Sequence, residues 1–212
     1  MGQYYTPVLM GKRYGVQATL YSWDYHNGLK LMEHSYMGNN FVNAVLRKID
    51  HQPMRIAWMG DYADDYPDDD SKIREPYQQK LLKKNFMRIF DQQGTKRIRP
   101  EPLEGFDKPE DFDGWYLINH SRKAYVDLGK YQRKNGWTEK WTDRNGVTHE
   151  CWSVVHPLPL LTACGNGRGG GDYHSNYPDY DKVGTWAFDL IEFASYEPVG
   201  FTKEEYYFKE GE

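Results

Sequence analysis

Residues 137–155 read WTEKWTDRNGVTHECWSVV, and this stretch decides the fold class that we predict. Two runs rich in Trp, Thr and Val, at 137–142 and 147–155, flank the pair Asn145-Gly146. Both residues of this pair tolerate positive φ, so they favour the tight turn of a β-hairpin. The sequence therefore predicts two antiparallel strands here. Further strands in this half are predicted at 115–119, 124–128 and 185–193.

The first half of the chain adds helices to the strands. Apolar residues recur at helical spacing from Phe41 to Ile49, and Asn39 or Asn40 can cap that helix. A second helix is predicted at about 75–93, and Thr202 with Glu205 suggests a short terminal helix. Strands are expected at 4–10, 15–25, 29–35 and 54–59. We predict an α+β fold: an antiparallel sheet with two main helices packed on one face.

Length and composition predict one ordered globular domain over residues 1–212. Aromatic residues make up 16% of the chain and the net charge is only −4, so large rings can supply a core. Residues 95–114 are polar and contain three prolines. They form the candidate connection between two possible halves, 1–94 and 115–212.

One phrase occurs twice, as GDYADDYPDDD at 60–70 and GDYHSNYPDYD at 171–181. The matching offsets suggest two loops of one conformation and pseudo-duplicated halves. Chance similarity is the alternative, because the chain is rich in Asp, Tyr and Gly.

The aspartates of the two phrases suggest a divalent-cation site. Carboxylate oxygens suit calcium or magnesium, and imidazole can join them, which makes Asp61, Asp172 and His156 the candidate ligands. No EF-hand pattern or paired-histidine motif is present, so the plainer alternative is a solvated acidic turn. With His174 added, the same residues would serve a divalent-metal-dependent hydrolase or transferase.

A glycine-rich loop precedes the second phrase and suggests an anion site. Its backbone N–H groups could approach a phosphate, and a guanidinium at its centre could pair with one. The candidate residues are Gly165, Gly167, Arg168, Gly169 and Gly170. No helix or Lys-Ser/Thr follows, so neither a dinucleotide fingerprint nor a P-loop is formed. A flexible loop or a close crossing of two backbones is the alternative.

Tyrosines in the second phrase extend this candidate site to Asp172, Tyr173, His174 and Tyr177. Tyr-, Gly- and Asp-rich loops are typical of adaptable protein-binding surfaces, and the rings can also stack on a base. Rings that cap the core are the alternative. We therefore expect a non-catalytic binding protein whose ligand is a partner protein or a phosphorylated small molecule such as a nucleotide. A phage or mobile-element accessory factor would fit this description.

Other classes find little support in the sequence. The mixed charge gives no warrant for nucleic-acid binding, and no apolar run approaches the ~20 residues that span a bilayer. The N-terminus lacks the pattern of a secretory signal. Cys151 and Cys164 are expected to be buried thiols, which together with these absences predicts a cytoplasmic location.

Overall fold

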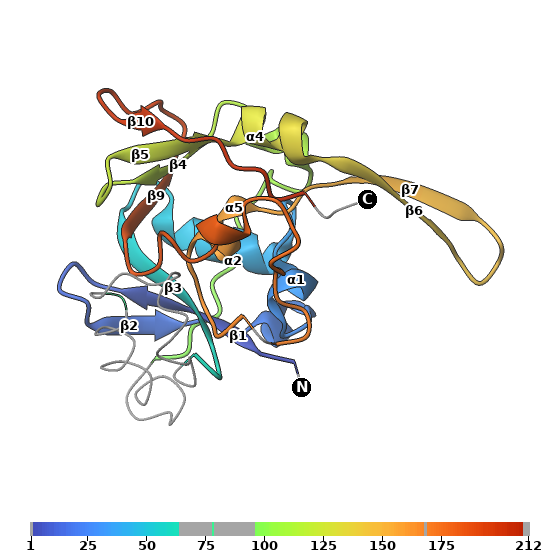
Figure 1. Ribbon diagram of the computed structural model, residues 1–212, viewed down its shortest axis with the longest axis horizontal. Helices are drawn as coiled ribbons and strands as arrows, with labels where there is room; N and C mark the ends of the chain where they lie inside the picture. The colour runs from blue at the N-terminus through green and yellow to red at the C-terminus, as the bar shows by residue number, and fades with distance from the viewer. Residues whose placement is uncertain (1, 64–77, 79–95, 168, 210–212) are drawn as a thin grey trace.

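The computed structural model describes residues 2–63, 78, 96–167 and 169–209 (Figure 1). The fold mixes helices with a large, mostly antiparallel sheet. The predicted helix at 75–93 falls almost entirely outside the described residues.

The main sheet has the strand order β10-β5-β4-β9-β3-β1-β2, with β8 beside β3. Two of its pairings, β3 with β8 and β5 with β10, are parallel. Strands from both sides of the 95–114 connection meet here, because β9 lies between β4 and β3. The strands are β1 Tyr5–Met10, β2 Val16–Thr19, β3 Met54–Gly60, β4 Tyr116–Asn119, β5 Ala124–Asp127, β8 Ala163–Cys164, β9 Leu190–Ala194 and β10 Thr202–Lys203.

The predicted helix after Gly38 is confirmed as α2, Asn40–Ile49. The Asn39 side chain caps it by accepting hydrogen bonds from the N–H groups of Phe41 and Val42. Its apolar residues are buried in the main core. Among the described residues, the other α-helices are α1 Leu31–His34, α4 Leu128–Asn135 and α5 Pro157–Leu161.

Aromatic rings fill the core beside α2. The Trp58 indole N–H donates to His34 Nε2 (2.9 Å), and His34 Nδ1 lies 3.0 Å from the carbonyl oxygen of Gly28. Because Nε2 accepts, the neutral imidazole carries its proton on Nδ1 and donates it to that carbonyl. Burial lowers the pKa of His34 to about 4, consistent with the neutral form.

Several predicted elements differ from the structure. The strand expected at 29–35 is wrong: α1 forms there, and the Glu33 side chain accepts from the Lys30 N–H at its start. The strand expected at 15–25 ends at Thr19, and a 3-10 turn follows at Ser22–Tyr25. The last core strand begins only at Leu190.

The chain end also departs from prediction. Instead of a helix capped by Thr202, residues Thr202–Lys203 form β10, because they pair with the free edge of β5. Helix α4 was not predicted. It follows β5 directly, and the Asp127 carboxylate accepts from the Lys130 N–H at its start.

The predicted hairpin is confirmed as β6, Trp137–Thr142, and β7, Thr148–Ser153. The two strands form their own sheet and project away from the body (Figure 1); we call residues 137–153 the β6–β7 arm. Its loop has three residues: Asp143 N–H donates to the Val147 carbonyl, and Gly146 has a φ of +80°. Gly146 supplies the left-handed residue that this loop type needs.

The thiol prediction holds only for Cys164, which is buried. Cys151 is exposed because it lies in the middle of β7 in the arm. Neither cysteine forms a disulfide.

Candidate functional site

The glycine-rich loop lies against the N-terminal segment, as one side of a buried polar cluster. Parallel pairing of β3 with β8 sets the ends of these strands side by side, so that Gly60 and Gly165 leave the sheet next to each other. Gln3 is fully buried there. Its Oε1 accepts from the Tyr5 hydroxyl (2.7 Å) and from the Asn166 N–H (3.1 Å).

Two glycines of the loop are required by this close approach. A Cβ on Gly165 would lie 2.0 Å from the Tyr5 hydroxyl oxygen, and a Cβ on Gly169 would lie 2.5 Å from the Gln3 backbone nitrogen. Gly170 forms a bridge with Gly2, while Gly167 has a φ of +66°. Gly169 thus lets two segments of backbone cross, which is the alternative to an anion cradle, and Gly165 leaves room for the Tyr5 side chain. Arg168 lies outside the described residues.

Asp172 is the buried charge of this cluster, with 3% of its surface exposed. Its Oδ2 accepts from the Gly169 N–H (3.2 Å), whereas Oδ1 is buried and accepts no hydrogen bond from the described part of the chain. Burial raises the pKa of Asp172 to about 6, although the Tyr5 hydroxyl and the Gly169 N–H lower it. A carboxylate here opposes the binding of an anion at the loop.

The candidate metal ligands are only partly brought together. Asp61 lies close enough to Asp172 to raise its pKa further, and His174 is close enough to lower it. Asp61 Oδ1 already accepts a hydrogen bond from the Tyr4 N–H (2.9 Å). His156 lies elsewhere in the core, where its Nδ1 accepts from the Leu158 N–H and its ring packs on Phe112.

Within residues 2–63, 78, 96–167 and 169–209, no group of three or more His, Cys, Asp or Glu side chains is placed to hold a metal ion.

The tyrosines of the second phrase are mainly core residues. Tyr173 is buried, donates to the Pro178 carbonyl (2.6 Å) and packs against Tyr177 and Phe208. Tyr177 is only partly buried and packs on the main core. These rings match the core-capping alternative. Tyr66, in the first phrase, lies outside the described residues.

The two copies of the repeated phrase differ in their described parts. Gly171 has a φ of +86° and opens a turn, whereas Gly60 ends strand β3 without a positive φ. Tyr173 is buried, but its counterpart Tyr62 is half-buried. The structure thus gives the start of the two phrases different local conformations.

Two buried acids contact His120 and Arg122 in the turn between β4 and β5. His120 Nε2 lies 2.6 Å from a carboxylate oxygen of Glu192, and Arg122 Nε donates to Asp189 (2.7 Å). The Tyr196 hydroxyl also donates to Glu192. Each buried carboxylate thus has a polar partner, as buried charged groups require.

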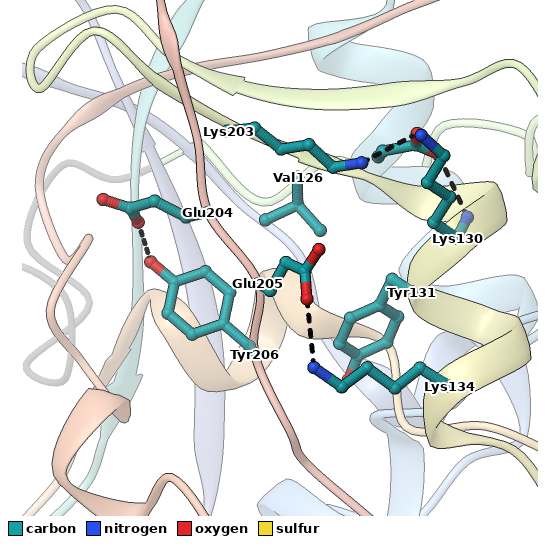
Figure 2. A pocket seen from close by; sticks show the side chains of 9 residues that line it. Val126, Lys130, Tyr131, Lys134, Lys203, Glu204, Glu205 and Tyr206 are labelled. Atoms are coloured by element: carbon teal, nitrogen blue, oxygen red, sulfur yellow. Dashed lines mark hydrogen bonds and ion pairs between the residues drawn. The ribbon is translucent and has the colours of Figure 1, made fainter.

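A pocket lies between α4 and the C-terminal segment (Figure 2). Three lysines that line it face acidic groups: Lys203 and Lys130 lie near Asp127, and Lys134 pairs with Glu205. Tyr131, at its wall, donates to the Val155 carbonyl. Positive and negative lining groups balance, so the pocket selects neither an anion nor a cation.

The sequence did not identify the arm as a binding element. From Thr138 to Trp152 every residue except the half-buried Asp143 is exposed. The exposed residues include Trp141 (49%), Trp152 (40%) and Val147 (53%). The signal that could have found it is the placement of tryptophans on both faces, since alternation puts Trp141 and Trp152 on opposite sides.

Comparison with family models, with curated proteins and with solved structures found no match to this chain. No helix among the described residues is long and apolar enough to cross a membrane. The site must therefore be interpreted from its own geometry.

Proposed function

We propose that this chain is a non-catalytic interaction protein that binds a partner protein through the β6–β7 arm. The observation that carries the proposal is the exposure of three large apolar side chains on an element that leaves the body (Figure 1). Large apolar side chains on both faces of one projecting ribbon give a partner protein anchors on either side of the strands.

The arm also offers backbone hydrogen-bonding groups. A two-stranded ribbon has two outer edges, and each carries N–H and C=O groups that an added strand can pair with. Recognition by strand addition takes its affinity from such main-chain bonds and its specificity from alternate side chains. Trp141 and Trp152 are suitable anchors, because tryptophan is enriched among the residues that dominate interface energies.

A phosphorylated small molecule as the ligand, and a divalent-metal-dependent enzyme as the function, have weaker support. The loop N–H groups of Asn166 and Gly169 donate to Gln3 and Asp172 rather than facing a vacant cradle. A metal-dependent hydrolase would need ligands that converge, and His156 packs apart in the core. We therefore assign the binding of a partner protein to the β6–β7 arm.

Site-specific photo-cross-linking tests the proposal. A photoreactive residue replaces Val147 in the arm in one sample, and Val199 in the body, which is 98% exposed, in the other. After irradiation in a lysate of the producing cells, we expect a discrete protein adduct from position 147 and none from position 199. Equal labelling from both positions, or none from 147, would reject the arm as the binding element.

A further inference from the structure

Alternate residues of β7 direct their backbone N–H and C=O groups toward the outer edge of the arm, and the register of the arm shows which residues these are. At the loop end of the arm, the Asp143 N–H donates a hydrogen bond to the Val147 carbonyl. Two residues further along each strand, Trp141 lies opposite His149. Pairs alternate between bonded and non-bonded along an antiparallel ladder. The N–H and C=O groups of Thr148, Glu150 and Trp152 therefore point away from β6. No other described strand pairs with this edge.

We propose that two copies of the chain join along these edges, with their β7 strands antiparallel about a twofold axis at His149. This inference rests on the proposed function and names the partner as a second copy. An isolated hairpin is marginally stable in water, whereas the four-stranded sheet β6-β7-β7-β6 has the strand number that stable sheets need. A twofold interface of this kind is the commonest way for identical chains to associate.

Charge excludes several registers. An axis at Glu150 would place this carboxylate directly opposite that of the partner's Glu150. Pairing through β6 with an axis at Glu139 or Lys140 would likewise oppose identical charges. Like charges directly opposite each other destabilise a sheet. With the axis at His149, Glu150 faces the partner's Thr148 and Val147 faces the partner's Cys151.

The length of the arm supports the same register. An axis at His149 pairs Val147 with the partner's Cys151 and brings the turn at Asn145 alongside the partner's Ser153. The two arms then overlap along their exposed length, and the bodies lie at opposite ends. Moving the axis to Cys151 would carry the loop past the partner's Ser153, where the chain enters the core at the fully buried Val154.

This register also covers exposed aromatic surface. Trp141 and His149 are already stacked, with ring centroids 5.3 Å apart and planes at 19°. Both side chains lie on one face of the arm because they are directly opposite in the ladder. Across the axis they would meet the same pair from the second copy. A row of four rings would then cross the sheet, each shielding the next from water.

The molecular mass in solution tests the inference. We expect the full chain to have twice the mass of 25.0 kDa by native mass spectrometry and by light scattering at tens of micromolar or above. Glu150→Pro removes an outward N–H from β7 without removing a bond to β6, and should give a monomer. Lys140→Pro makes the matching change on the outer edge of β6, since Lys140 pairs with Glu150, and should stay dimeric.

A cross-link tests the register. In a Cys151→Ser background, His149→Cys should form an intermolecular disulfide under mild oxidation by copper-phenanthroline, because directly opposed residues lie ~4.5–5.5 Å apart. The unmodified Cys151 should not cross-link. It lies opposite the partner's Val147, and four residues along that strand separate it from the partner's Cys151 by about 14 Å.

Three results would overturn the inference. One is a monomer at all concentrations, the second is a dimer that survives Glu150→Pro, and the third is cross-linking through native Cys151 instead of position 149. A monomer that still gives the Val147 adduct with a different protein would reject the second copy while leaving the proposed function intact. Thermal melting of each variant shows whether its body has stayed folded.

Discussion

Asp172 makes the folding stability depend on pH in a direction that is unusual for an acid. Burial raises the pKa of its carboxyl from 3.8 to about 6. Between these values the folded chain holds the proton and the unfolded chain releases it, so the free energy of unfolding falls as the pH rises. A pKa increase of this size changes the free energy of unfolding by about 3 kcal/mol in total. Roughly 2 kcal/mol of it falls between about pH 4.5 and 7.5.

The substitution Asp172→Asn removes this titration while keeping an oxygen that can accept from the Gly169 N–H. We expect the stability of the variant relative to the wild type to rise by about 2 kcal/mol between about pH 4.5 and 7.5. The variant must be compared with the wild type because two buried histidines also make stability depend on pH. Burial lowers the pKa of His34 to about 4 and that of His156 to about 3, so both raise the free energy of unfolding as the pH rises, equally in the two proteins.

Urea unfolding followed by tryptophan fluorescence measures this difference across the pH series. Parallel stability profiles for the two proteins would refute the reasoning, because they would show that the Asp172 carboxyl binds its proton no more tightly in the fold than in the unfolded chain. Titration of the carboxyl carbon by NMR would report the same result directly.

Two further predictions concern the packing of the body. Gly165→Ala should destabilise the chain by about 1–3 kcal/mol, because the added methyl overlaps the Tyr5 hydroxyl; Gly15→Ala, with no atom within 4 Å of the new Cβ, is the matched control in the same urea titration and should change stability little. Trp58→Phe should cost about 1–3 kcal/mol, because it leaves His34 Nε2 buried without a donor; an unchanged unfolding midpoint would show that this hydrogen bond contributes nothing.

Local signals in the sequence were sufficient for several elements. Asn39 with the apolar spacing of Phe41–Ile49 defined α2 because a cap and a periodic face act within a few residues. Asn145-Gly146 defined the arm hairpin for the same reason, although its loop contains three residues rather than two. The strand at 54–59 was also located correctly as the core of β3.

Elements that depend on distant partners were missed. Thr202–Lys203 became a strand because the edge of β5 was available, which no local pattern reveals. Residues 31–34 became α1, where His34 reaches Trp58 across the core. At the glycine loop, the spacing of Gly165 and Gly169 was visible, but the segment they approach, around Gln3, lies over 160 residues away in the chain.

Amide hydrogen exchange along the arm tests most directly whether the outer edge of β7 accepts another strand. The N–H groups of His149 and Cys151 point toward β6 and serve as internal references within the same strand. At concentrations where the chain associates, we expect the outward N–H groups of Thr148 and Glu150, which lie opposite each other across the twofold axis, to become as protected as these references, and to lose that protection on dilution. Rapid exchange of the outward groups at every concentration, with the inward groups protected, would contradict pairing at this edge.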